Sequence, residues 1–210
     1  MTMAEVSIRN FEPRADNREI ANITCEIFIE DLAYWFKEPP TDLLAEAYPW
    51  LHHVNPETFL IAEVDGKVVG FIRGILSYRS FSTKLLFHSL LSPLRIAKIK
   101  FALLKVIKWA LVKDLIAQII KNPYDNAAVI EELAVHKYYR RAGIGKALMD
   151  SMLCILKKKG AKEVRLEVRH DNKSAIQFYK KVGFVQIGVH KGSFTKWLIM
   201  AKVLDEESQR

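Results

Sequence analysis

The stretch of sequence that decides the fold is Arg140-Arg141-Ala142-Gly143-Ile144-Gly145-Lys146. It lies between an apolar run at 127–135, which predicts a strand, and a helical pattern over residues 142–159. Gly143 and Gly145 have no Cβ, so the backbone there can approach a ligand closely. The first amides of the helix have no intrahelical partner. Together with the neighbouring basic side chains, they predict a site for a phosphate group.

Spacing excludes two common nucleotide-binding motifs at this turn. The ATP-type P-loop G-x-x-x-x-G-K-[ST] requires glycine at position 140 and serine or threonine at 147, where the chain has Arg140 and Ala147. The dinucleotide pattern G-x-G-x-x-G requires a third glycine at the position of Leu148. The pattern R-x-x-G-x-G between a strand and a helix remains. A turn whose glycines serve only tight packing stays open as the alternative.

A second segment supports the ligand-binding interpretation. It reads Arg165-Leu166-Glu167-Val168-Arg169-His170-Asp171-Asn172, then Ser174-Ala175-Ile176-Gln177-Phe178-Tyr179-Lys180-Lys181-Val182-Gly183-Phe184. Asparagine, alanine, tyrosine seven residues after the asparagine, and Gly-Phe follow the R-x-x-G-x-G turn in order. The two segments together resemble the GCN5-related N-acetyltransferase (GNAT) superfamily, closely over residues 127–190. Within it, the Leu-Glu-Val-Arg-x-x-Asn…Tyr pattern resembles the ribosomal-protein alanine N-acetyltransferases.

The resemblance implies a GNAT fold of the α/β (α+β) class, in one domain over residues 1–210. We expect a mixed, mostly antiparallel, twisted sheet of about seven strands with helices on both faces, splayed between the fourth and fifth strands. Alternating and apolar runs predict strands at 6–11, 59–64, 67–76, 127–135, 162–169, 184–190 and 196–203. Helical patterns are expected at 18–29, capped by Asp16 or Asn17, within 30–55 with breaks at Pro39-Pro40 and Pro49, at 142–159 and at 172–182. Asp65-Gly66 predicts a hairpin turn.

The resemblance also implies acetyl-CoA as the co-substrate. The strand before the turn would pair its backbone with the pantetheine arm, and the amides of residues 141–146 would hold the pyrophosphate. Asn172 would contact the pantetheine or orient the site. The expected cofactor-binding residues are therefore Leu133, Ala134, Val135, Arg140, Arg141, Ala142, Gly143, Ile144, Gly145, Lys146 and Asn172.

Three residues are candidate catalytic groups. Attack on a thioester requires a base, because a free amine is mostly protonated near neutral pH. The resemblance places Tyr179 beside the thioester sulfur, where a phenol can protonate the leaving thiolate, and makes Glu167 the base. Glu132 on the cofactor strand is the other candidate base, ahead of Glu131. The alternatives are that Tyr179 only packs its helix onto the sheet, and that Glu167 belongs to a solvated charge ladder.

The connection at about residues 77–126 departs from a compact GNAT domain. The net charge is +8, and residues 79–121 hold nine Lys/Arg with one acidic residue, so the rest of the chain is neutral overall. The spacing predicts a basic amphipathic helix over 94–121. This insertion would pack on the body, act as a lid over the acceptor pocket, or contact an anionic membrane surface or acidic partner. Nucleic acid is not an expected partner, because no recognisable motif accompanies the basic stripe.

The sequence thus predicts an N-acetyltransferase that moves an acetyl group from acetyl-CoA to a primary amine of a small molecule, peptide or protein. A non-catalytic CoA-binding module that uses the basic helix for interaction is the alternative. No metal site is expected, because the six histidines and two cysteines lack ligand spacing. Two distant cysteines, no apolar run of ~18–20 residues and no signal peptide favour a cytoplasmic location. A homodimer is one open assembly state.

Overall fold

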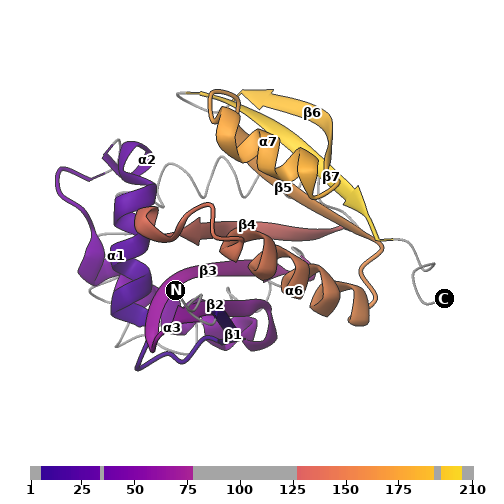
Figure 1. Ribbon diagram of the computed structural model, residues 1–210. Coiled ribbons are helices and arrows are strands. Elements are labelled where there is room, and N and C mark those ends of the chain that lie inside the picture. Colours follow the sequence, from indigo (N-terminus) through magenta and orange to yellow (C-terminus); the bar gives the residue numbers. More distant parts are fainter. Residues whose placement is uncertain (1–5, 34–35, 78–126, 192–194, 205–210) are drawn as a thin grey trace.

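A computed structural model of the chain describes residues 6–33, 36–77, 127–191 and 195–204. They contain a seven-stranded sheet in the order β1-β2-β3-β4-β5-β7-β6. β4 and β5 are parallel, and all other neighbours are antiparallel, which confirms the mixed, mostly antiparallel sheet (Figure 1). The strands are β1 (Val6–Asn10), β2 (Phe59–Val64), β3 (Lys67–Ile75), β4 (Ala128–Val135), β5 (Glu163–Arg169), β6 (Val185–Lys191) and β7 (Lys196–Val203).

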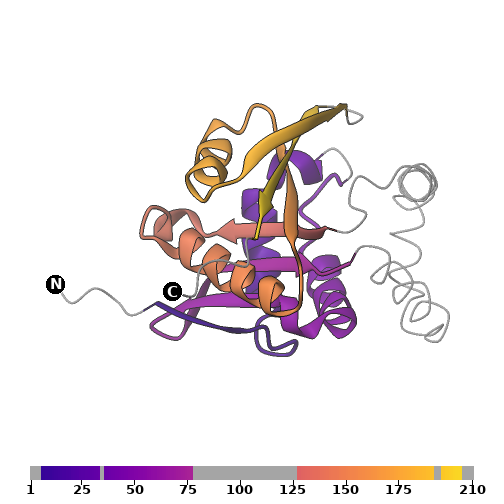
Figure 2. The ribbon, with the colours of Figure 1, turned by 90° about the vertical axis from the view of Figure 1, so that its right-hand side faces the viewer.

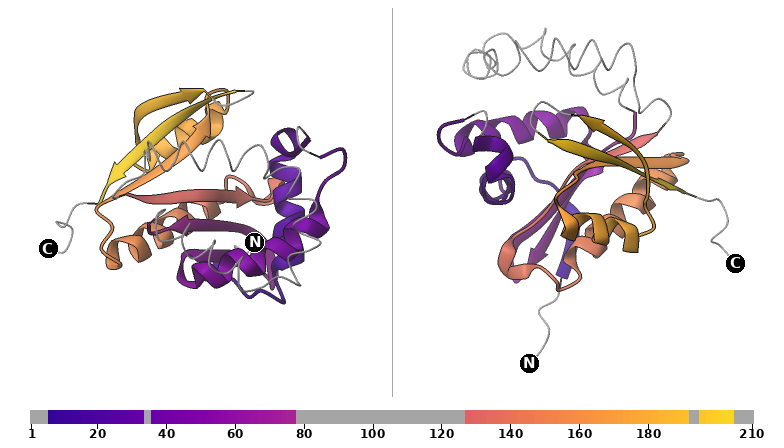
Figure 3. Two further views of the ribbon diagram at one scale, coloured as in Figure 1. Left: turned by 180° about the vertical axis from the view of Figure 1, so that it is seen from behind. Right: turned by 90° about the horizontal axis from the view of Figure 1, so that it is seen from above.

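Helices cover both faces of the sheet. They are α1 (Asn17–Ile27), α2 (Ile29–Ala33), α3 (Thr41–Val54), α6 (Ile144–Lys158) and α7 (Lys173–Lys181), with 3-10 turns at Pro56–Thr58 and Lys137–Tyr139. α1 and α3 lie on one face and α6 and α7 on the other (Figures 2 and 3). Each face buries an apolar cluster, because alternate residues of a strand point to opposite sides.

The predicted hairpin turn is confirmed. β2 and β3 pair up to Val64 and Lys67, and the two residues between them, Asp65 and Gly66, have φ of 49° and 75°. Two positive φ angles belong to the tight turn whose twist matches that of antiparallel strands.

The predicted break at Pro49 is wrong, because α3 continues through it from Thr41 to Val54. A proline inside a helix leaves the carbonyl four residues earlier, here that of Ala45, without its helical donor. Asn17 of α1 supplies a donor instead, with Nδ2 3.0 Å from the Ala45 oxygen. The break at Pro39-Pro40 is confirmed, since α3 starts directly after it.

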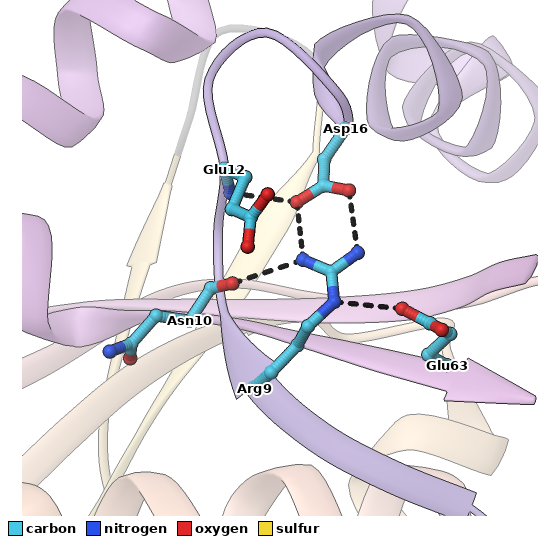
Figure 4. A network of polar contacts seen from close by, with 5 residues as sticks. All are labelled: Arg9, Asn10, Glu12, Asp16 and Glu63. Carbon is cyan, nitrogen blue, oxygen red and sulfur yellow. Dashed lines mark hydrogen bonds and ion pairs between the residues drawn. The ribbon is translucent and has the colours of Figure 1, made fainter. Parts of the chain in front are cut away.

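The sequence predicted that Asp16 could cap α1, but its side chain does not do so. It precedes the helix but makes no capping hydrogen bond, and its carboxylate is 1% exposed. Arg9 of β1 donates to both carboxylate oxygens at 2.7 Å, and the Glu12 amide donates to one of them (Figure 4). Arg9 also reaches Glu63 of β2 at 2.7 Å, so this network ties the start of α1 to two strands.

Other boundaries shift by a few residues. The helix predicted over 18–29 is two helices, α1 and α2, with Phe28 between them. The predicted insertion at 77–126 and its helix over 94–121 lie outside the described residues, apart from Ser77.

Candidate active site

The parallel pairing of β4 and β5 is short. Only Ala128–Ile130 pair with Val164–Leu166, and beyond these residues the two strands separate (Figure 1). The predicted splay between the fourth and fifth strands is therefore confirmed. We call residues 131–135 of β4 and 167–169 of β5 the fork. Among the residues that the structure describes, none forms a strand partner for the backbone along its inner edges.

A β-bulge places two acidic residues together at the start of the fork. β3 and β4 change register so that Arg73 pairs with Glu132 and Gly74 with Ile130, which makes Glu131 an extra residue. A bulge turns two successive side chains toward similar directions, whereas a regular strand would separate them. Arg73 contacts both carboxylates, with Nη2 3.1 Å from Glu131 Oε2 and Nε 3.1 Å from Glu132 Oε2.

Burial and charge act against each other in this cluster. Burial raises the pKa of Glu131, and the attraction of Arg73 opposes this shift, while Glu132 and Glu167 add to it by repulsion. Burial would lower the pKa of Arg73, but attraction by Glu132 and Glu131 leaves it above its ordinary value. Tyr48 of α3 lies close enough for the charge of Glu132 to affect it, and burial is the main cause that raises its pKa.

Glu167 lies on the other side of the same opening. It directly follows Leu166, the last residue of β5 that pairs with β4. Strand alternation buries Leu166 and Val168 and leaves Glu167 partly exposed. His190 of β6 reaches it, with Nδ1 3.3 Å from Glu167 Oε1. Two of the predicted bases, Glu132 and Glu167, therefore flank one opening.

The turn at 140–146 fits a phosphate group. Between described residues, none of the backbone hydrogen bonds comes from the amides of residues 141–146, and the first is from Ala147 to the Gly143 oxygen. Gly143 precedes α6 with φ 82°, and Arg141 has φ 66°. Six consecutive amides at a helix N-terminus provide donors and positive potential for an anion.

The turn lies against the fork and against α7. Arg140 Nε donates to the Val135 carbonyl at 3.0 Å, so this guanidinium braces the end of β4. A Cβ built on Gly145 would be 3.8 Å from atoms of both Val135 and Phe178. The absent side chain thus keeps space between the predicted pantetheine strand and α7. Lys146 forms an ion pair with Asp150 one helical turn later.

α7 carries Tyr179 and begins at Asn172. Burial raises the pKa of Tyr179 to about 12, so its hydroxyl stays protonated near neutral pH. Its ring contacts Phe178 and Phe184, with centroids 5.4 and 6.0 Å away. Asn172 caps the helix by accepting a hydrogen bond from the Ala175 amide at 3.0 Å. A contact of Asn172 with pantetheine stays a prediction.

Sequence reasoning missed Arg73 and His190. Arg73 had a usable signal, because a charged residue within the apolar run at 68–76 requires a partner when the strand is buried. It is 8% exposed. No comparable sequence signal existed for His190. The pattern at 184–190 predicts a strand but does not show that this histidine pairs with Glu167.

A third ion-pair group lies at the far end of β5. Arg169 Nη1 is 3.1 Å from Glu30 and 3.0 Å from Asp31, both in α2, and Arg169 Nη2 is 2.8 Å from Asp171. These contacts connect α2 to the β5 side of the fork.

Residues 20–184 match the family model described as the acetyltransferase (GNAT) family. The chain belongs to this family. It is 32% identical over 152 residues to an N-alpha-acetyltransferase of Sulfurisphaera tokodaii, covering 70% of each chain. It is 33% identical over 67 residues to the ribosomal protein bS18 alanine N-acetyltransferase of Escherichia coli, covering 32% of this chain and 45% of that enzyme. The crystal structure of Ard1 from Thermoplasma volcanium aligns with TM-score 0.61 and 27% identity, over 96% of this chain and 99% of that one.

Family membership makes the chain an acetyl-CoA-dependent N-acetyltransferase and confirms the resemblance noted from its motifs. Among the described helices, none is both long and apolar enough to span a membrane. Within the same part of the chain, no group of three or more His, Cys, Asp or Glu residues could hold a metal ion.

Proposed function

We propose that this chain, as a single catalytic domain, acetylates the free α-amino group at the start of a peptide or protein. The relative in Sulfurisphaera tokodaii, named an N-alpha-acetyltransferase, supports this acceptor class. The observation that carries the proposal is the fork. Its two strands separate at a pair of carboxylates, and beside it lies a turn whose six amides, at 141–146, make no backbone hydrogen bond to another described residue.

That arrangement supports the cofactor-binding residues that the resemblance implies. Amides of residues 141–146 would hold the pyrophosphate, with charge from Arg141, while Arg140 braces the strand end. The free backbone edge at 133–135 would hold the pantetheine arm, and the bare position at Gly145 leaves room for it. When bound, acetyl-CoA supplies a thioester, which carries the acetyl group in an activated form.

Glu167 is the proposed base. An α-amine is mostly protonated near neutral pH, so a carboxylate must remove a proton before the amine can attack. Glu131 and Glu132 are held by Arg73, whose guanidinium keeps its protons. The contacts of Glu167 include a histidine, His190, and an imidazole can gain and lose a proton. Glu132 is the runner-up, and its variant is the control that separates the two.

Tyr179 is the proposed acid. Its hydroxyl Oη keeps its proton near neutral pH, since burial raises its pKa to about 12. Such a group is in the protonation state that a departing thiolate needs. The amine attacks directly in this account, so no side chain becomes acetylated.

The proposal is tested by acetyl-CoA binding and by acetyl transfer. Isothermal titration should detect acetyl-CoA binding. Mass spectrometry should then detect one acetyl group on a peptide with a free amino-terminal alanine. The matched control is the same peptide with a blocked amino terminus and an internal lysine. Transfer only to the lysine peptide would replace the proposed acceptor. Cofactor binding without transfer to peptides, polyamines, amino sugars or aminoglycosides would favour a non-catalytic CoA-binding module.

A further inference from the structure

We infer that His190 carries the proton that Glu167 removes from the acceptor out to solvent. This inference rests on the proposed function, because it requires Glu167 to take that proton. A base that accepts a proton in every turnover must also release it in every turnover. The structure contains a direct route for that release.

The route is a contact between two strands that are not neighbours. Glu167 of β5 pairs with Ile199 of β7, and Ile199 pairs with Gly188 of β6. Gly188 has no side chain, and a Cβ there would lie 3.5 Å from the Ile199 side chain, so Ile199 is the residue that lies between the two strands in this row. His190, two residues further along β6, reaches across to Glu167 at 3.3 Å. The Glu167 side chain is 27% exposed and that of His190 is 46% exposed, so exposure increases from base to histidine.

The other charged groups near Glu167 cannot serve as the carrier. Arg165 and Arg169 flank it on the same face of β5. Their guanidinium groups stay protonated at any pH at which the protein is folded. Glu131 approaches from β4 and its carboxylate repels that of Glu167, but Glu131 is paired with Arg73. An imidazole is the side chain that exchanges protons readily near neutral pH.

The proton balance is simple. The acceptor ammonium gives one proton to the Glu167 carboxylate, which leaves a neutral amine and a carboxylic acid. The carboxylic acid passes that proton to Nδ1 of neutral His190, which restores the carboxylate and gives imidazolium. The imidazolium releases one proton to a water or buffer base, which restores the starting state of both side chains.

His190→Gln tests this route. Acetyl transfer from acetyl-CoA to the alanine peptide is measured for the wild type, for His190→Gln and for His53→Gln, an exposed histidine on α3 outside the fork. We expect His190→Gln to lower kcat by about 10-fold, below the ~10²–10⁴-fold of the base itself. The KM values for both substrates should stay within about twofold, because His190 acts on proton release and not on binding.

Added imidazole separates a proton carrier from a merely structural residue. Free imidazole should raise kcat of His190→Gln with increasing concentration and leave the wild type and His53→Gln unchanged. Wild-type kcat in His190→Gln, or a loss that imidazole does not reverse, overturns the route. His190→Asn repeats the test if the glutamine variant melts at a lower temperature. A wild-type protein without transfer to any acceptor overturns the proposed function itself, and the proton route with it.

Discussion

Glu131 and Glu167 are the first residues beyond the last paired positions of β4 and β5, so two carboxylates flank the point where the sheet opens. They are close enough for the charge of Glu167 to raise the pKa of Glu131. Glu131 contacts Arg73, and the contacts of Glu167 include His190. We propose that Arg73 supports the carboxylates of β4 electrostatically and that His190 carries the proton from Glu167.

Removal of Arg73 should destabilise the protein strongly. Arg73→Met leaves two poorly exposed carboxylates without their shared cation, and breaking such a buried pair costs about 3–5 kcal/mol. Urea unfolding measures the loss. Arg18→Met is the control, because the Arg18–Asp42 pair is exposed and such pairs contribute about 0–1 kcal/mol. Equal losses in the two variants would show that Arg73 does not hold the bulge.

Two glycines of the turn should differ in how alanine affects their stability. At Gly143, φ is 82° with no atom near the new methyl group, so Gly143→Ala should lower the free energy of unfolding by about 1–2 kcal/mol. Gly145→Ala meets neighbours at an ordinary 3.8 Å, so its stability should change by less than about 0.5 kcal/mol.

Gly145→Ala also tests the cofactor site. The methyl group of Gly145→Ala enters the space between Val135 and Phe178, so acetyl-CoA should bind about 10-fold more weakly by isothermal titration. Wild-type affinity in this variant would place the pantetheine arm elsewhere.

The phosphate-binding part of the site could be predicted from the sequence, because its residues follow one another along the chain. The strand, the turn at 140–146 and the helix are neighbours in sequence, so glycine spacing reports the phosphate site directly. Arg73 and His190 enter the site through sheet register, which a single sequence does not display. The bulge that brings Glu131 beside Glu132 and the donor that lets α3 continue through Pro49 are also tertiary effects.

Tyr179 predicts an alkaline limit on stability. The pKa is 10.0 unfolded and about 12 folded, so the stabilising contribution is complete below pH 10 and is lost as pH rises toward 12. Tyr179→Phe cannot ionise, so its free energy of unfolding should fall less over this range than that of the wild type. Tyr48 contributes a similar dependence to both proteins, because burial also raises its pKa. Parallel pH curves for the two proteins would contradict the raised pKa of Tyr179.

The Arg169 contacts predict a selective effect on the acceptor. Arg169→Gln removes the ion pairs to Glu30 and Asp31, so α2 is held less firmly at the β5 side of the fork. These pairs are partly exposed, so the free energy of unfolding should change by less than about 1 kcal/mol. The KM for the alanine peptide should rise severalfold while the affinity for acetyl-CoA stays constant. An unchanged KM would show that α2 does not border the acceptor.

In the proposed reaction Glu167 removes the acceptor proton at the fork. This step is tested most directly by the kcat of Glu167→Gln for acetyl transfer to the alanine peptide, with Glu132→Gln measured beside it and acetyl-CoA affinity checked for both. We expect Glu167→Gln to lower kcat by about 10²–10⁴-fold with unchanged acetyl-CoA affinity, and Glu132→Gln to have a smaller effect. Near wild-type kcat in Glu167→Gln, with the large loss in Glu132→Gln, would show that the base lies on β4 and not on β5.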